Sequence, residues 1–270
     1  MKKSKNKRLI YTTVLTTLLL VAIAFLLVCG LISLISSVKP FYQTKDRTEE
    51  IKKYAKENKD TTTIGWIRVQ GTNIDYPVIY TKSQDELQTK MDDFTWVIDN
   101  VDKITNYVYI LGHNIRNVSS NPIITDKNHT RFEQLPSFMY LDFAKENKYI
   151  QYTINGKNYL YKIFSVSIVE EDRLLYNTDN YSKAELKTYI DDSLQDSFYD
   201  FDVDVDENDN IITLATCTRF YGATAMYTYK IDARMVRDGE KIKNYSVKEN
   251  KNYDKIKKIM EGGEKNEKEI

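Results

Sequence analysis

The chain has 270 residues, 41% of them hydrophobic, which is enough for one sizeable core with short appendages. Basic and acidic side chains balance at 39 each, but the first eight residues hold five basic groups and no acidic one, so the remainder is mildly acidic. This charge pattern argues against a nucleic-acid partner. The sequence shows neither a Gly-rich phosphate loop nor a Cys/His cluster with metal-ligand spacing, so we expect no cofactor and no metal.

An uncharged and mostly apolar run covers residues 9–38. A membrane-spanning helix needs roughly 20 apolar residues, so the run predicts a transmembrane anchor. Basic residues favour the cytoplasmic side, so residues 1–8 would form a cytoplasmic tail and the rest of the chain would lie outside the cell membrane. A cleaved signal peptide is the alternative. Its apolar core would end near small residues such as Ala22 and Ala24, but the apolar run continues past them.

A polar segment, residues 39–62, leads to the main domain, which we expect over residues 63–238. Apolar residues at helical spacing over 49–57 favour a short amphipathic helix, with a solvated linker as the alternative. The domain opens with two short β-prone runs on either side of Gly71, which predicts two strands joined by a turn. Pro77 should then lie on a strand edge or at a bend.

A second pair of β-prone runs leads to a histidine. Residues 94–99 and 107–111 predict two strands, the later one central because it is continuously apolar or aromatic. Gly112 permits close backbone approach, and His113 follows at the strand end. Imidazole is readily poised to move protons near neutral pH, although a structural histidine bonded to a carbonyl is the alternative. The other histidine, His129, lies in a polar stretch typical of an exposed loop.

The middle of the domain carries a hairpin and a helix. Asn155 and Gly156 lie between two alternating runs and supply the backbone that a tight turn requires. Ser182 and Glu185 have the spacing of a capping box and begin a run with apolar residues at helical intervals. The sequence therefore predicts a long helix between the hairpin and the last core strands.

The strand predicted after this helix ends in a cysteine. Alternation over residues 211–216 predicts a strand that runs out at Cys217. The other cysteine, Cys29, lies in the predicted anchor, so we expect no disulfide within the domain. A thiol at a strand end is held by the sheet yet reachable, as a nucleophile must be. The alternative is a small buried hydrophobe.

Three of these segments resemble the sortase family. Thr213-Leu-Ala-Thr-Cys217 is similar to the TLxTC motif, Leu111-Gly-His-Asn114 to the histidine segment, and Gly65–Val78 to the opening strands of class B members. The resemblance runs from about residue 65 to residue 236. It implies a mainly β fold, a closed β-barrel with peripheral helices, in which the long helix before the cysteine strand marks class B.

The resemblance also implies an activity. A class B sortase is a cysteine transpeptidase that cleaves a C-terminal sorting signal after Thr and transfers the protein to a peptidoglycan-precursor amine through a thioacyl-enzyme. Cys217 would be the nucleophile and His113 the general acid/base, with Thr216 and Asn114 as candidate substrate-binding residues. Its partners would be surface proteins that carry the sorting motif and the acceptor amine, with no nucleic acid, metal or cofactor.

One expected residue is missing. The family places an arginine on the strand after the cysteine, but the stretch 220–230 contains none. Counting from either side puts the position at Met226, Tyr227 or Thr228. Arg219, close to Cys217, is our choice for the group that stabilises the oxyanion or the substrate, and Lys230 is the alternative. Arg234 lies too far along the strand. A catalytically degenerate chain is the third possibility.

Residues 239–270 are rich in Lys, Glu and Asn, which predicts a charged tail that is mobile or partly helical. Two other functions stay open. A pilus-type sortase joins pilins through a lysine, but such enzymes often carry a lid and a second anchor near the C-terminus, and neither is visible here. The other function is that of a surface binding module that has the barrel fold but no catalytic activity.

Overall fold

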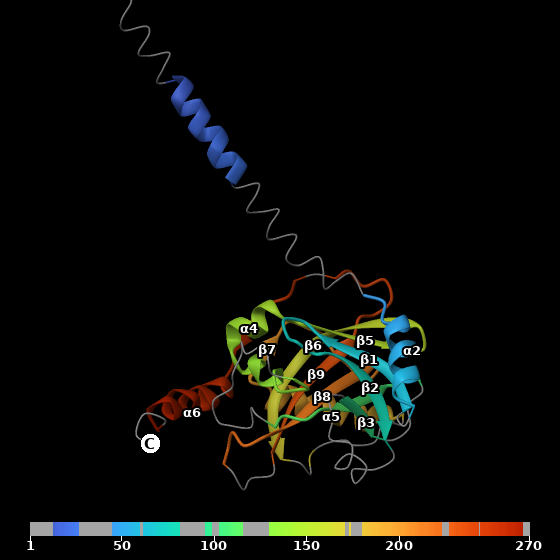
Figure 1. The fold of residues 1–270 in the computed structure, drawn as a ribbon. Coiled ribbons are helices and arrows are strands. Elements are labelled where there is room, and N and C mark those ends of the chain that lie inside the picture. Colours follow the sequence, from blue (N-terminus) through green and yellow to red (C-terminus); the bar gives the residue numbers. More distant parts are fainter. Residues whose placement is uncertain are drawn as a thin grey trace, which may run out of the picture. The chain divides into compact units, whose positions relative to one another are not determined.

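The computed structural model describes residues 13–26, 45–59, 62–81, 95–98, 103–115, 130–170, 173, 180–222, 227–242 and 244–266. The chain divides into two units, Met1–Gln43 and Thr44–Ile270. In the first unit residues 13–26 form a helix, drawn in blue in Figure 1. No helix in the described part of the chain is long and apolar enough to cross a membrane. The other residues of the predicted anchor lie outside the described ranges, so the anchor stays a prediction.

The second unit is built on a closed barrel of strands in the order β1-β2-β3-β4-β8-β9-β6-β5 (Figure 1). Their bounds are β1 Thr62–Val69, β2 Asp75–Thr81, β3 Thr95–Ile98, β4 Tyr107–Leu111, β5 Tyr149–Ile154, β6 Lys157–Glu170, β8 Ile211–Thr218 and β9 Tyr227–Met235. Two neighbouring pairs are parallel, β2 with β3 and β4 with β8, and the other pairs are antiparallel. The predicted closed, mainly β barrel is confirmed.

Strand β4 shows why its sequence is continuously apolar or aromatic. Side chains alternate between the two faces of a strand, and both faces of β4 are buried. Val108 and Ile110 lie on one face, whereas Tyr107 and Tyr109 on the other pack in a cluster with helix α5. A strand covered on both sides needs apolar residues at every position, so the prediction of a central strand is confirmed.

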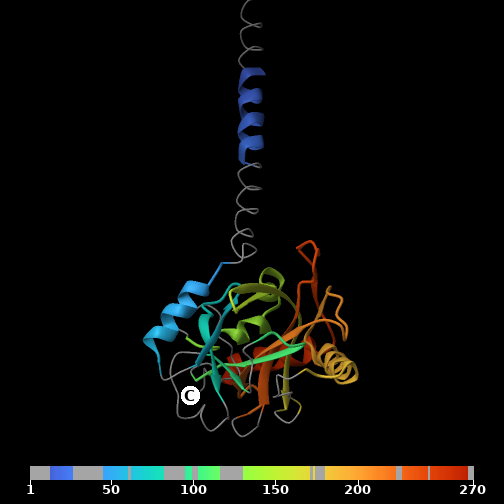
Figure 2. The same ribbon diagram turned by 90° about the vertical axis from the view of Figure 1, so that its right-hand side faces the viewer.

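Helix α5, Lys183–Asp196, is the predicted long helix. Figure 2 shows it in gold beside the barrel. Its first turn is closed by the predicted capping box, in which Ser182 and Glu185 each satisfy the other's backbone N–H. Leu186, Tyr189 and Ile190 are buried along its inner face and pack on the cluster that includes strands β4 and β8. The helix therefore covers the outer face of the strands that end in His113 and Cys217.

The strand turns follow the predicted chemistry. Asn155 and Gly156 join β5 to β6 with φ angles of 51° and 70°, which is the left-handed backbone of a tight hairpin turn. Pro77 lies in β2, one residue before pairing with β3 begins at Val78. Proline has no N–H for a ladder, so this position tolerates it. Both predictions are confirmed.

Helix α2, Thr48–Glu57, is the predicted amphipathic helix. It belongs to the same unit as the barrel, because that unit begins at Thr44. Just before the helix, the buried Arg47 forms an ion pair with Asp75, and the Trp66 indole N–H donates to the same carboxylate at 2.6 Å. These contacts fix the helix to β1 and β2. The predicted linker, residues 39–62, is therefore divided between the two units.

The C-terminal segment is more ordered than its composition suggests. Strand β10, Val247–Glu249, pairs with β7, Tyr199–Phe201, and is followed by helix α6, Tyr253–Asn266. Tyr245, Val247, Tyr253 and Ile256 are all buried. The sequence predicted a tail over residues 239–270 that is mobile or partly helical, and helix α6 agrees with the helical part. The pairing of β10 with β7 was not predicted, because it joins residues far apart in the chain.

Candidate active site

The two strands that carry the predicted catalytic pair are neighbours. Strands β4 and β8 are parallel, with Leu111 in register with Ala215. The Gly112 N–H donates to the Ala215 carbonyl at 3.1 Å, so the pairing continues past the strand end. His113 lies two residues beyond Leu111 and Cys217 two residues beyond Ala215, so the parallel pairing places both at the same end of two neighbouring strands. The fold therefore brings both residues to one edge of the barrel.

The two side chains differ in their access to solvent. Cys217 is exposed at the end of β8, whereas the residues before it in the strand are buried. His113 is half-buried. The alternative that Cys217 is a small buried hydrophobe is thus excluded. An exposed thiol next to a partly desolvated imidazole is the arrangement that a cysteine nucleophile and its base require.

Two hydrogen bonds tie the strand ends together. The Thr216 hydroxyl donates to the Gly112 carbonyl at 2.6 Å, and the Asn114 side-chain amide donates to the Cys217 carbonyl at 3.1 Å. Thr216 has 0% of its surface exposed and Asn114 has 3%. The structure therefore presents neither side chain to a substrate, contrary to the expectation that both bind it. Their contacts instead fix the relative position of His113 and Cys217.

A short turn precedes the 3₁₀ helix η1, Leu135–Met139, and contacts the histidine segment. The Phe132 N–H donates to the His113 carbonyl at 3.0 Å. The Phe132 ring lies so close to Gly112 that a Cβ there would be 2.4 Å from the ring's Cγ atom. Only glycine allows this approach, as the sequence suggested. Helix α4, Leu141–Glu146, then leads to β5.

The electrostatic setting of His113 has two sources. Burial lowers the pKa of the imidazole, and the positive charge of Arg131 lowers this pKa further. Arg131 is half-buried and precedes Phe132, whose backbone is bonded to the histidine. Sequence reasoning missed this arginine because it lies 18 residues beyond His113 in a polar segment with no motif. Only the folded backbone brings the two together.

The candidate cations differ in their exposure and in their partners. Arg219 is exposed, in the turn that follows β8, where the Gly222 N–H donates to its carbonyl at 2.9 Å. It remains the predicted stabiliser. Arg234 is buried and bound to Glu240 at 2.6 Å and Asp204 at 3.1 Å, so it is excluded as a site group.

Lys230, the alternative to Arg219, is also held away from the site. It pairs with Ala215 on β8, has 3% of its surface exposed, and turns under helix α5. There its ammonium group donates to Ser193 at 2.8 Å and lies 3.0 Å from a carboxylate oxygen of Asp232. The ammonium group also donates to the Tyr189 hydroxyl at 3.2 Å. The structure therefore gives Lys230 a structural role.

The residue directly across from Cys217 on β9 is Thr228, and it is buried. Opposed residues of an antiparallel pair point to the same face of a sheet. Of the two described positions that counting left open for the missing arginine, Tyr227 and Thr228, Thr228 is therefore the one on the face of the thiol. Met226 and the other histidine, His129, lie outside the described residues.

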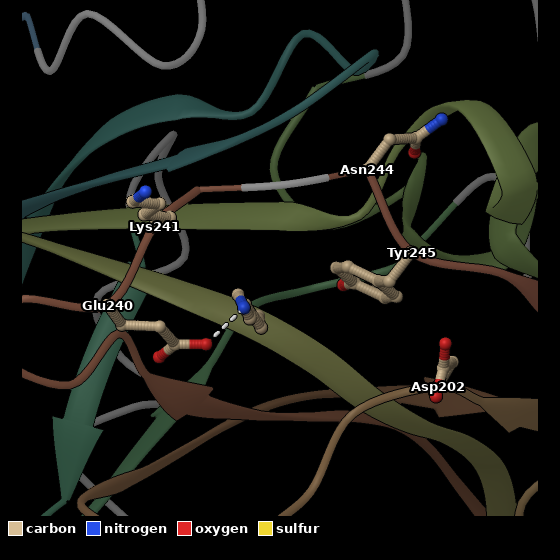
Figure 3. A pocket seen from close by; sticks show the side chains of 6 residues that line it. Asp202, Glu240, Lys241, Asn244 and Tyr245 are labelled. Carbon is tan, nitrogen blue, oxygen red and sulfur yellow. Dashed lines mark hydrogen bonds and ion pairs between the residues drawn. The ribbon is translucent and has the colours of Figure 1, made fainter.

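A cavity of about 370 Å³ opens elsewhere on the barrel (Figure 3). It is lined by Lys162, Asp202, Glu240, Lys241, Asn244 and Tyr245. The Glu240 carboxylate forms an ion pair with Lys162, and a dashed line at Glu240 in Figure 3 marks this contact. The cavity includes none of the predicted catalytic residues. Across the described ranges, no group of three or more His, Cys, Asp or Glu side chains could hold a metal ion.

Comparisons with known proteins agree with this geometry. A family model described as the sortase domain matches residues 67–236. Sortase B of Staphylococcus aureus is 25% identical over 173 residues, which is 63% of this chain and 68% of that protein. Sortase B of Listeria monocytogenes is 26% identical over 181 residues, covering 63% and 67%. The X-ray structure of Clostridium perfringens sortase B is similar with a TM-score of 0.55 and 26% identity, covering 69% of this chain and 99% of that one.

Proposed function

Because the chain belongs to the sortase family, we propose that it is a class B cysteine transpeptidase in which Cys217 attacks and His113 transfers protons. The observation that carries the proposal is the parallel register of β4 and β8, which brings an exposed thiol and a half-buried imidazole to one barrel edge. The relatives named sortase B support the class. The cavity in Figure 3, which holds no thiol and no imidazole, has no part in this chemistry.

The proposed reaction has two halves. His113 takes the thiol proton as the Cys217 sulfur attacks the carbonyl carbon of the substrate threonine, forming a tetrahedral oxyanion. The C–N bond then breaks, and the imidazolium gives its proton to the leaving amine. An acceptor amine attacks the resulting thioester and gives a proton to His113 as the new C–N bond forms. The C–S bond then breaks, and His113 returns this proton to the Cys217 sulfur. No oxidant or metal enters this balance.

Other side chains have supporting roles in this proposal. Asn114 and Thr216 hold the two strand ends in register through the hydrogen bonds to Cys217 and Gly112. We assign contact with the oxyanion or the substrate backbone to Arg219, which is exposed two residues beyond Cys217. The arginine expected on β9 is absent, so this chain must supply positive charge from another segment.

The substrates follow from the family. We propose a C-terminal sorting signal cleaved after Thr, with a peptidoglycan-precursor amine as acceptor. Sortase B of Staphylococcus aureus has been solved with a substrate, and a sortase B has been solved with a triglycine peptide, which carries an amine. These structures are 20% identical to this chain and show the fold alone. The apolar run at 9–38 would hold the domain at the outer face of the cell membrane, with the N-terminus in the cytoplasm.

A second function has one observation in its favour. Thr228 stands opposite Cys217, where a positive charge would be expected, so a barrel that binds sorting signals without cleaving them is the alternative. The test is to incubate the protein with LPxTG-, NPxTN- and PPxTG-like peptides and a glycine peptide, and to identify products by mass spectrometry. A transpeptidase yields a product joined after threonine, which the Cys217→Ala variant does not form. Binding without any product in the whole panel would favour the alternative.

A further inference from the structure

We propose that Arg131 is a positioning residue for the transfer reaction, a fixed positive charge beside His113 that sets the charge state of the imidazole before it accepts the Cys217 proton. This inference rests on the proposed function. The positive charge that acts on His113 then comes from the turn that precedes η1 and not from strand β9.

The backbone fixes Arg131 next to the histidine. The following residue, Phe132, donates its N–H to the His113 carbonyl at 3.0 Å, and its ring packs against Gly112. The turn is closed again by Glu133, whose N–H donates to the Thr130 carbonyl at 3.2 Å and whose carboxylate accepts the Thr130 N–H at 2.9 Å. Arg131 is therefore part of a fixed turn that is bonded to the strand end.

The conformation of Arg131 is costly for its residue type. Its φ angle is 58°, in the left-handed region that glycine adopts readily and that most side chains avoid. Among the described residues, the other non-glycine residue with positive φ is Asn155 in the hairpin turn, a residue type suited to that conformation. Glycine or asparagine would suit the Arg131 backbone better. Residues held in such a conformation cluster at functional sites, which fits a role for the Arg131 side chain next to His113.

The charges around His113 define what that guanidinium does. Cys217 lies on the neighbouring strand β8, Glu133 is buried in the turn that contains Arg131, and Arg219 is exposed beyond β8. Burial lowers the pKa of His113, and the charge of Arg131 lowers this pKa in the same direction. A neutral imidazole at neutral pH can accept the thiol proton. Once protonated beside Arg131, it is a stronger acid and releases that proton readily to the leaving amine.

The cations on β9 cannot do this work. Lys230 is enclosed under α5 with Asp232 and Ser193, and Arg234 is bound to Glu240 and Asp204. Thr228, which faces the thiol, carries no charge. The cation whose charge lowers the pKa of His113 is thus Arg131, in the turn before η1 and not on β9.

The first test measures His113 directly, by NMR titration of its ring protons in the full chain. The background is Cys217→Ala with His129→Asn, which leaves one histidine. Arg131→Gly should raise the titration midpoint, and Arg131→Lys should keep the midpoint low. Lys187→Gln, which removes an exposed charge on helix α5, is the matched control and should leave the midpoint unchanged. An unchanged midpoint in Arg131→Gly would overturn the inference.

Two further readouts separate charge from folding. Arg131→Gly relieves the left-handed strain, so its melting temperature should equal or exceed that of the parent protein. Its transpeptidation rate should nevertheless need a higher pH to reach half of its maximum, by the same shift as the titration midpoint. If the parent protein forms no thioester, the proposed function fails while the titration still tests Arg131. If the parent is active and Arg131→Gly has the parent's pH profile, only the present inference fails.

Discussion

Replacing Lys230 with methionine tests whether this lysine is structural or catalytic. Lys230 is almost fully buried, and its ammonium group contacts Ser193, Tyr189 and Asp232 within 3.2 Å. Methionine has a similar length but leaves the Asp232 carboxylate buried without its cation. Removing one partner of a buried ion pair costs about 3–5 kcal/mol of unfolding free energy.

The remaining contacts of Asp232 place the expected loss near the lower end of that range. Its carboxylate also accepts hydrogen bonds from the Tyr189 and Thr213 hydroxyls, both at 2.7 Å. We therefore expect Lys230→Met to lower the unfolding free energy by about 3 kcal/mol, measured by urea denaturation. The double variant Lys230→Met/Asp232→Asn should lose less, because no buried charge remains uncompensated.

The same proteins decide the catalytic question. At a temperature where Lys230→Met is folded, its rate of peptide cleavage should stay within about threefold of the parent's, since less than about 1 kcal/mol of barrier is at stake. A variant with parent-like stability and abolished turnover would refute the structural reading and restore Lys230 as the stabilising cation.

Two further predictions follow from the contacts of the site and of the cavity. Asn114→Ala removes the amide that donates to the Cys217 carbonyl. The cleavage rate should fall by roughly fivefold to tenfold, while the unfolding free energy falls by only about 1 kcal/mol. An unchanged cleavage rate would show that this hydrogen bond does not position the thiol. Hydrogen bonding to Arg234 holds the pKa of Glu240 well below its usual range. A depressed carboxyl pKa contributes stability that is complete above the unfolded-state pKa of about 4.3 and is lost as pH falls below it. Glu240→Gln should therefore show a smaller drop in melting temperature between neutral and acid pH, and an unchanged acid dependence would contradict this.

Local sequence patterns were sufficient for most of the fold. The hairpin at Asn155, the capping box at Ser182 and the continuous run of β4 each depend on neighbouring residues, so each could be predicted and each is confirmed. Strand pairing depends on residues far apart in the chain. The sequence showed that strands end at His113 and Cys217, but the parallel register that aligns these ends appears only in the fold.

The site's charges were harder to predict for the same reason. Strand alternation correctly put Lys230 on the same face as Thr228, but it could not show that α5 covers Lys230. Thr216 and Asn114 adjoin the catalytic pair in sequence, yet both turn inward to backbone carbonyls. Arg131 carries no motif and reaches His113 through a turn, so no local signal could have found it.

The most direct test of the account is the rate and the location of thioester formation. The full-length protein is incubated with a sorting peptide and no acceptor amine, and the adduct is mapped by mass spectrometry. We expect one acyl group on Cys217, none in Cys217→Ala, and formation at least about a hundredfold slower in His113→Ala. An adduct on another residue, or an undiminished rate without His113, would contradict the claim that these two residues act together.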